Sequence, residues 1–366
     1  MAWVIYACPP PGGAMGAGPL PEGQPAGPAP LAAGEIARYV VAAAAWAPSV
    51  HNTQPWRFTA VGQQISLRAD AGRQLMVADP EGREMMISCG AALFTARLAL
   101  RSLGYIPQAS VVPDPGQPLL VARLRWGRRA ECTEFEQALF GQVRQRRTHR
   151  GGFDLVPLAP GLLATLRESA ARHGAMLRIV TDDGRRAALA AAVAEAEGAE
   201  RFDTERVREL ARWAPAPGSA ATDGVPSTSY PALPEHTDPD FPARDFAHGR
   251  GWGMAPLSTA PWPRSAGVVA LLTTARDLPV DWVNAGQALQ RILLTASISG
   301  VAAALHTQPL ELGWLREFIR ARLSDGAYPQ LVLRLGAVVQ AAASVRRPPE
   351  DVLSASGSEN TGISHG

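Results

Sequence analysis

The chain has 366 residues, 46% of them hydrophobic, and a formal net charge of +2. This length fits one large domain or two ordinary ones, with enough apolar residues for a proper core. The near-neutral charge balance gives no electrostatic case for nucleic acid or an anionic membrane as the main partner. No stretch approaches the roughly 18 consecutive apolar residues that a membrane span needs.

The first 30 residues differ from the rest. Residues 1–30 are mostly Pro, Gly and Ala after a weakly apolar start without a basic region, which predicts a disordered leader and no signal peptide. The three cysteines, Cys8, Cys89 and Cys132, are too widely spaced for a disulfide framework or a zinc site, so no metal is predicted. They point to a reducing cytoplasm.

An alanine-rich helix is predicted over residues 31–45. It ends before Pro48, which cannot donate a hydrogen bond to a helix and pushes Ala47 away from the α region. A polar turn follows, and a strand begins at Trp56. Apolar periodicity predicts further helices over residues 86–104, 162–173, 187–197, 204–213, 284–300 and 310–323, and strands over 64–68, 119–126, 176–180 and 331–335.

The chain contains a hidden repeat. Residues 90–104 and 286–300 both have glycine at each end and Ala-Leu at the same places, and Trp46-Ala47-Pro48 recurs as Trp213-Ala214-Pro215. Two matches in the same order predict two related halves, with an extra helix in the second. We expect a first half over residues 31–140, a second half over 141–353 with an insertion at 214–263, and a disordered tail over 354–366.

The turn after the first helix is rich in side chains that form hydrogen bonds. Ser49, Asn52 and Gln54 offer donors and acceptors at close range, which is the mixture that the pyrimidine edge of a flavin needs. The alternative is a turn whose polar groups only satisfy the backbone.

The string Ala47-Pro48-Ser49-x2-Asn52-x-Gln54-Pro55-Trp56-Arg57-Phe58 resembles the flavin-contacting segment of FMN-dependent nitroreductases. From about residue 31 to residue 353, the chain resembles that family's fused, duplicated Acg-like branch of actinobacteria. The resemblance implies FMN as cofactor and an α+β nitroreductase-like fold, in which two tandem halves mimic the family's homodimer in one monomeric chain. The ring contacts that it implies in this segment are Pro48, Ser49, Asn52 and Gln54.

The resemblance also implies where the FMN phosphate binds. The family's Arg-x-Ser/Thr-x-Arg/Lys motif matches Arg146, Thr148 and Arg150, and Arg346 and Arg347 fall where the family places its C-terminal phosphate arginines. Guanidinium groups bind phosphate oxygens two at a time. A solvated helix end is the alternative for such a run, and which arginine of the C-terminal pair points inward stays open.

Each half lacks one part of a site. No arginine motif precedes the first half, and Trp213-Ala214-Pro215 is not followed by the Asn or the Gln-Pro-Trp of the first copy. Because ring contacts from one half would face phosphate contacts from the other, the resemblance implies one complete FMN site per chain.

The family places a backbone donor near flavin N5 in the segment after its long helix. Here that segment includes Leu305, His306 and Thr307. His306 is a weak candidate for carrying a proton, since a lone histidine beside an apolar helix is more often a packed, hydrogen-bonded residue. The flavin itself performs hydride chemistry, so no catalytic acid is required in principle.

Residues 214–263 combine ten prolines with five aromatic side chains, Tyr230, Phe241, Phe246, Trp252 and Trp262. A disordered linker would be poor in aromatics, and a long loop inside a domain is usually functional. We interpret this segment as a cover across the flavin cleft, with Trp252 or Trp262 near the ring. A surface loop clamped elsewhere remains the alternative.

The resemblance implies an oxidoreductase that passes hydride from NAD(P)H to flavin N5 and then to a nitro or other electron-poor acceptor. Its partners would be a small-molecule electron donor and acceptor. Two alternatives remain open at this point: an FMN-storing protein of the stress response with little turnover, and a desaturating oxidase of natural-product metabolism.

Overall fold

The computed structural model describes residues 31–232, 235–248, 250–254, 264–338 and 344–355. The predicted leader with Cys8, Trp262 of the predicted cover, and residues 356–366 of the predicted tail lie outside these residues.

The first half begins with α1 (Ala33–Ala44), which buries Ile36, Val40 and Val41. A tight turn leads into the antiparallel hairpin of β1 (Trp56–Val61) and β2 (Gln64–Ala69). The remaining elements are α2 (Arg83–Ser102), β3 (Gln108–Val111), β4 (Leu120–Arg125) and α3 (Glu134–Gln142). The elements predicted up to residue 126 are all present, and β3 and α3 are additional.

The second half follows the same succession with an insertion. It starts with α4 (Pro160–Ala171) and β5 (Ala175–Ile179). The insertion contains α5 (Asp183–Phe202), α6 (Thr204–Arg212), β6 (Thr237–Asp238) and β7 (Arg264–Ser265). The half is completed by β8 (Val268–Thr274), α7 (Pro279–Ile298), β9 (Val301–His306), α8 (Gln308–Glu311), α9 (Gly313–Arg322) and β10 (Tyr328–Ala337).

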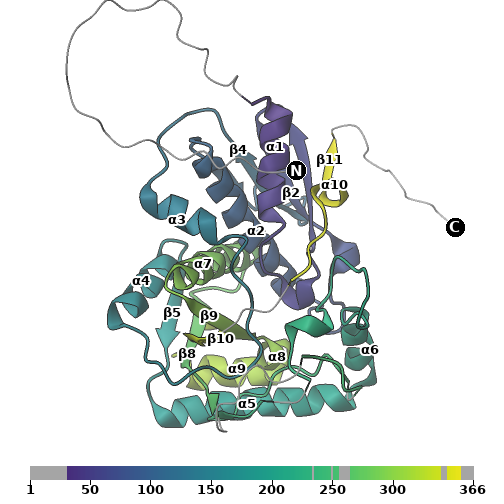
Figure 1. Cartoon of the computed structure of the whole chain (residues 1–366), viewed down its shortest axis with the longest axis vertical. Coiled ribbons are helices and arrows are strands. Elements are labelled where there is room, and N and C mark those ends of the chain that lie inside the picture. Colours follow the sequence, from purple (N-terminus) through teal and green to yellow (C-terminus); the bar gives the residue numbers. More distant parts are fainter. Residues whose placement is uncertain (1–30, 233–234, 249, 255–263, 339–343, 356–366) are drawn as a thin grey trace, which may run out of the picture. The chain divides into compact units, whose positions relative to one another are not determined.

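The two halves share one sheet topology. The first sheet has the order β1-β2-β4-β3 and the second the order β5-β8-β10-β9, with every one of these neighbouring pairs antiparallel. In both, two strands precede a 20-residue helix, α2 or α7, and two strands follow it. Figure 1 shows α2 and α7 together at the centre, and residues from both sheets and both helices form one continuous core. The predicted α+β fold with two tandem halves is confirmed.

One of the two sequence matches behind that prediction is wrong. Trp213-Ala214-Pro215 lies at the end of α6, inside the insertion between β5 and β8. The topological equivalent of α1 is α4, because each precedes the first strand of its sheet. The position that corresponds to the polar turn is therefore the short link from Arg172 to Gly174.

The C-terminal residues return to the first half. After α10 (Pro349–Val352), β11 (Leu353–Ala355) pairs in parallel with β1, and Phe58 lies opposite Leu353. The predicted tail therefore starts too early, since Ser354 and Ala355 belong to this strand. The single helix predicted over residues 310–323 is two helices, because Leu312 has an extended backbone between α8 and α9.

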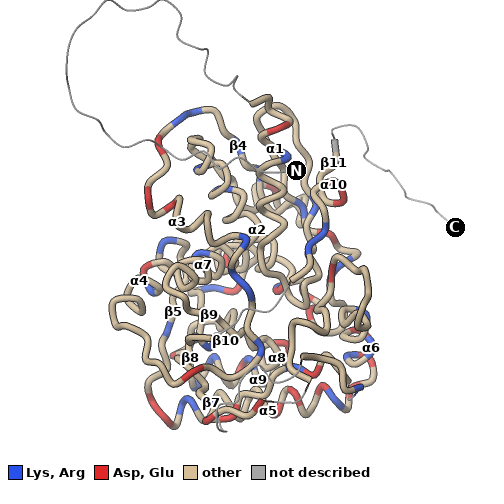
Figure 2. The backbone as a smooth tube through the Cα atoms, viewed as in Figure 1, with Lys and Arg blue, Asp and Glu red and all other residues tan. Residues whose placement is uncertain are grey.

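The charge pattern is mixed. Blue and red segments lie side by side over most elements of the tube in Figure 2. In the part of the chain that the structure describes, no helix is both long and apolar enough to cross a membrane.

Candidate functional site

The polar turn after α1 is held in a strained conformation. Three non-glycine residues have positive φ angles: His51 at 45°, Asn52 at 55° and Gln54 at 49°. Such residues cost free energy and persist where the surroundings enforce them, often at functional sites. Ser49 Oγ accepts from the Gln54 backbone N–H at 2.9 Å, and Ser88 Oγ on α2 accepts from the Val50 N–H at 3.2 Å. The turn is therefore built before any ligand arrives.

The two amide side chains of the turn are tied to distant segments. Asn52 Nδ2 donates to the carbonyls of Gly224 at 2.9 Å and Val345 at 3.2 Å. Gln54 Nε2 donates to the Thr222 carbonyl at 2.9 Å, and Gln54 Oε1 accepts from the Arg347 N–H at 2.8 Å. Asn52 and Gln54 thus link the polar turn to residues 222–224 and 345–347. This agrees with the alternative interpretation of the turn, in which its polar side chains form hydrogen bonds with the backbone.

A cavity of about 110 Å³ opens beside this turn. It is enclosed by residues of both halves and of the insertion, and its apolar walls come from Ile87, Leu289, Leu305, Leu331 and Phe246. Of the predicted site residues, it is lined by Pro48, Ser49, Thr148, Arg150, Leu305, His306 and Thr307. We call it the first cavity.

A second, smaller cavity of about 30 Å³ is lined by arginines: Arg146, Arg147, Arg150 and Arg346. Asn52 and four members of the first cavity's wall, Pro48, Ser49, Thr148 and Arg150, also line it. Because the two cavities share these walls, they form one slot with a mainly apolar end and a cationic end.

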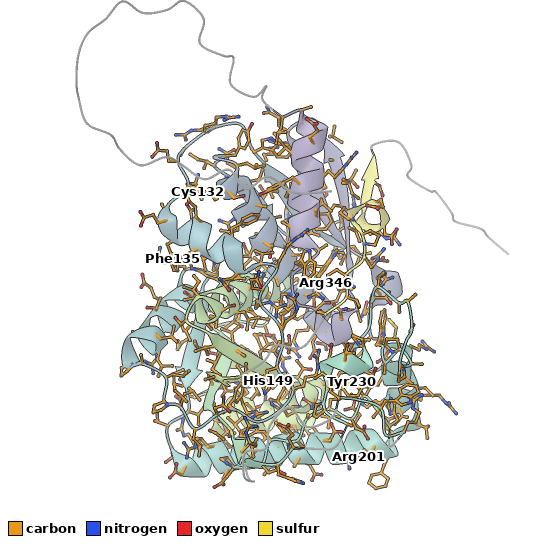
Figure 3. The ribbon with its side chains drawn as sticks, viewed as in Figure 1. Cys132, Phe135, His149, Arg201, Tyr230 and Arg346 are labelled. Atoms are coloured by element: carbon orange, nitrogen blue, oxygen red, sulfur yellow. The ribbon has the colours of Figure 1, made fainter. Side chains whose placement is uncertain are left out.

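The arginines come from two segments that flank the turn. The stretch after α3 runs alongside β9, where the His149 N–H donates to the Ala303 carbonyl at 2.8 Å. Arg346 NH2 donates to the carbonyls of Trp46 and Ala47, each at 3.3 Å. Figure 3 labels Arg346, His149 and Tyr230 around the middle of the described chain, on three segments far apart in sequence.

These arginines have no acidic partners. Among the described residues, none of Arg146, Arg147, Arg150 and Arg346 forms an ion pair with a carboxylate. Burial, together with neighbouring Arg147 and Arg150, lowers the pKa of Arg146 to about 10. The Nε atoms of Arg146 and Arg346 are buried and have no hydrogen-bond partner among the residues that the structure describes. A buried cationic cluster of this kind needs an anion.

Arg347 is a different case from its neighbour. Its guanidinium NH2 donates to the Asp351 carbonyl at 2.8 Å, and neither Arg347 nor Gln54 lines the slot. The structure thus distinguishes Arg346, which points into the second cavity, from Arg347, which braces the C-terminal segment. The predicted ligand contacts of Arg347 and Gln54 do not fit this arrangement.

His306 is buried and neutral. Its Nε2 accepts from Arg334 Nε at 2.9 Å, and burial, then Arg334 and Arg244, hold its pKa well below the usual value. Since Nε2 is the acceptor, we assign the ring hydrogen to Nδ1, which has no partner among the described residues. His306 lines the first cavity as a neutral ring and has no acidic proton to release near neutral pH.

The insertion covers the first cavity. Arg244 reaches inward and pairs with Glu200 at 2.6 Å and Glu311 at 2.5 Å, and its NH1 lies 3.3 Å from His51 Nε2. Phe246 packs edge-on against the His51 ring with centroids 5.6 Å apart. Both Arg244 and Phe246 line the first cavity. The described part of residues 214–263 therefore lies across the slot.

Of the two tryptophans expected near the ring, Trp262 lies outside the described residues. Trp252 lines neither cavity and instead stacks with Arg250, whose Cζ lies 4.0 Å from the ring centroid. Within the described part of the cover, the aromatic residue that lines the first cavity is Phe246. Glu84 at the start of α2 is another lining residue that the sequence analysis missed. Its only sequence signal was an Arg-Glu pair opening an otherwise apolar helix.

Comparison with known proteins assigns the family. The family profile described as "Nitroreductase family" matches residues 28–79. Mycobacterium tuberculosis Rv3131, provisionally named an NAD(P)H nitroreductase, is 36% identical over 304 residues, which cover 82% of this chain and 85% of that protein. The chain belongs to the nitroreductase family. A second M. tuberculosis nitroreductase-family relative, acg, is 28% identical over 87% of this chain and 95% of its own length.

Solved structures of nitroreductases are more distant. A nitroreductase with bound FMN from Desulfitobacterium hafniense DCB-2 is 14% identical, covers 59% of this chain and 97% of its own, and gives a TM-score of 0.38. The NADPH:FMN oxidoreductase of Vibrio harveyi is 13% identical, covers 63% of this chain and 80% of its own, and gives a TM-score of 0.35. These scores are too low to bear on the nitroreductase site described above.

Proposed function

We propose that this nitroreductase-family protein binds one FMN per chain in the slot and acts as an oxidoreductase. The isoalloxazine ring would occupy the first cavity, and the phosphate would lie among the arginines of the second. The observation that carries the proposal is the buried arginine cluster without carboxylate partners, at one end of a mainly apolar cavity.

The donor set fits the cofactor. A flavin mononucleotide phosphate carries a charge near −2 and presents several oxygens, which match the unpaired guanidinium groups of Arg146 and Arg150. Thr148 adds a hydroxyl between them. The polar turn brings Pro48 and Ser49 to both cavities, so one rigid segment would contact ring and phosphate ends alike.

When bound, FMN would supply hydride chemistry between NAD(P)H and an electron-poor acceptor. The protein's own residues would bind and orient the cofactor and shield it from water. Leu289 and Leu331 would pack on the ring, and His306 Nδ1–H would donate to an oxygen or nitrogen in the first cavity. Phe246 and Arg244 of the insertion would limit the access of water.

Reconstitution tests the proposal. The purified chain, incubated with excess FMN and desalted, should retain one equivalent with a shifted visible spectrum, and anaerobic NADH or NADPH should bleach it. Oxidation by a nitroaromatic or a quinone should restore the colour. A chain that retains no FMN, or two equivalents, would contradict the proposal. We also expect a cytoplasmic monomer, since the family's dimer is present within one chain, and size-exclusion chromatography checks the mass.

The closed cover favours a second candidate. Arg244 is buried between two carboxylates, so opening the cover would separate buried ion pairs. A protein that stores FMN with little turnover would have this property. Such a protein would bind FMN with one equivalent, yet multiple-turnover oxidation of NAD(P)H with any acceptor would remain near background.

A further inference from the structure

Glu84 is a buried carboxyl group that opens onto the first cavity. It lies in the first turn of α2, is 3% exposed, and lines the cavity. Its Oε1 accepts from Arg83 NH2 at 2.8 Å. Its Oε2 is buried and has no partner within the described residues. One oxygen of the carboxyl group is therefore held by Arg83, and the other is a buried atom, unsatisfied among the described residues, of a side chain that lines the first cavity.

The carboxyl groups around Glu84 outnumber the arginines that could neutralise them. Four carboxyls, those of Asp79, Glu84, Glu200 and Glu311, share this region with two buried arginines. Arg244 is engaged by Glu200 and Glu311, and Arg83 divides its donors between Glu84 Oε1 and the Gln330 carbonyl at 2.8 Å. A third arginine, Arg206, lies 3.6 Å from Glu311 and also pairs with Asp203 at 3.5 Å.

Asp79 is stabilised differently from Glu84. Its Oδ2 accepts from the Met85 backbone N–H at 2.9 Å, which favours a negative charge there. Glu84 has no comparable backbone donor, and burial followed by repulsion from Glu311 raises its pKa to about 8. Burial also raises the pKa of Asp79 to about 6 and the pKa of Glu200 to about 7, so Glu84 has the highest pKa of the three and most readily carries a hydrogen at neutral pH.

The other groups that face the first cavity cannot supply a proton. Burial lowers the pKa of His51 and His306 well below the usual value and also lowers the pKa of His149, the third histidine of the wall, so all three rings are neutral. The remaining charged lining residues are the arginines Arg150, Arg244 and Arg334. Among the described residues that line this cavity, Glu84 is the one acid. No group of three or more potential metal ligands was found in the described chain, so the carboxyl cluster is not organised around an ion.

We propose that Glu84 is the catalytic proton donor to an acceptor that binds against the flavin ring at the first cavity, an inference that rests on the FMN-dependent function proposed above. The acceptor is a nitro group or a quinone, whose oxygen can accept from Glu84 Oε2–H. A quinone would gain a hydride from the reduced cofactor and the proton released from the Glu84 O–H bond, and would become a hydroquinone. A nitro group would gain the same hydride and proton, and one of its N–O bonds would break to release water and leave a nitroso group. The resulting carboxylate is stabilised by Arg83 and later takes a proton back from water.

The test separates this role from cofactor binding. Glu84→Gln keeps the shape and a hydrogen-bond donor but cannot release a proton, and Glu81→Gln, an exposed neighbour, is the matched control. We expect both variants to retain one FMN and to be bleached by NAD(P)H at the wild-type rate. Reoxidation by the nitroaromatic or quinone should be about 100-fold slower in Glu84→Gln alone. The wild-type rate should fall above about pH 8, whereas the residual Glu84→Gln rate should not change there.

A second measurement does not depend on activity. Infrared difference spectra of the FMN-free wild type between pH 7 and pH 9.5 should contain a protonated-carboxyl C=O band that Glu84→Gln lacks and Glu81→Gln keeps. Absence of that band, or loss of FMN from Glu84→Gln, would overturn the proposal. If the wild type binds no FMN but shows the band, the proposed function fails while the neutral state of Glu84 holds. A wild-type reoxidation rate in Glu84→Gln would also overturn it.

Discussion

Gly90 and Gly286 occupy equivalent positions on α2 and α7, and each faces the backbone of the other helix. A Cβ on Gly90 would lie 2.1 Å from the Val283 carbonyl oxygen, and a Cβ on Gly286 would lie 1.9 Å from the Ile87 carbonyl oxygen. Ile87 and Val283 precede the two glycines by the same three residues. The contact is therefore reciprocal, as in an isologous dimer interface, although both surfaces belong to one chain.

This contact predicts the effect of adding one methyl group. Gly90→Ala and Gly286→Ala should each destabilise the fold by about 1–3 kcal/mol, because α2 and α7 must separate. Gly198→Ala in α5 is the control, since a Cβ there meets nothing within 4 Å, and it should stabilise the chain by about 0.5–1 kcal/mol. Urea unfolding of the three variants measures the differences. Equal stabilities would mean that the helices are not packed this closely.

Replacing Arg146 should separate ligand binding from stability. Arg146→Gln removes one of the buried cations, so FMN affinity should fall about 10- to 100-fold, which corresponds to about 1.5–3 kcal/mol. The FMN-free variant should melt at a higher temperature than the wild type, since mutual repulsion and burial disfavour the cluster. Arg167→Gln, exposed on α4, should change neither quantity. Fluorescence titration and thermal melts provide both readings, and undiminished affinity would exclude Arg146 from the site.

Arg244 should control whether the insertion stays closed. Arg244→Met leaves Glu200 and Glu311 without their buried partner and should cost about 3–5 kcal/mol locally. We expect faster proteolysis within residues 222–254 and faster bleaching of bound FMN by NAD(P)H. Arg250→Gln, which removes the stacking on Trp252 and a hydrogen bond to the Ala247 carbonyl but no contact with Glu200 or Glu311, is the control from the same segment. Bleaching at the wild-type rate in an Arg244→Met chain with a protease-sensitive cover would mean that the cover does not gate the slot.

The buried histidines should make the fold sensitive to acid. The pKa of His51 is lowered in the folded chain by burial and by Arg244, so the unfolded chain binds a proton more readily. Stability is therefore complete above the ordinary histidine pKa of about 6.5 and decreases as the pH falls below it. His51→Gln, which can still accept from Arg244, should reduce this loss, whereas His236→Gln at an exposed position should not. Unfolding at pH 7.5 and pH 5 tests the difference.

Periodicity and short motifs revealed much of this molecule. The helices α1, α2 and α7 and the strands β2, β4 and β10 follow from apolar spacing, and the arginine run and the polar turn meet at one slot although about 100 residues separate them. The repeat in residues 90–104 and 286–300 was visible because close helix packing requires glycine at corresponding places. Local physical requirements of this kind leave a signal in the sequence.

Other features depend on contacts between residues far apart in the chain, and these contacts cannot be recognised from local sequence patterns. The second Trp-Ala-Pro, at residues 213–215, does not correspond to residues 46–48, because a helix inside an insertion can end with the same three residues. Gln54 and Arg347 have the chemistry of ligand contacts but bond to each other, and only their tertiary pairing reveals it. Likewise, Phe246 rather than Trp252 meets the cavity, because the path of a proline-rich segment is set by the surface beneath it.

Parallel pairing of β11 with β1 has a consequence for biosynthesis. The first sheet's outer strand and the neighbouring turn are completed by residues at the far end of the chain, among them Val345, Arg346 and Leu353. A ribosome-bound chain that lacks its final segment has neither this strand pairing nor the guanidinium that reaches Trp46. Flavin binding at the proposed site would therefore await synthesis of residues 345–355, and a chain that stops before them would lack these contacts.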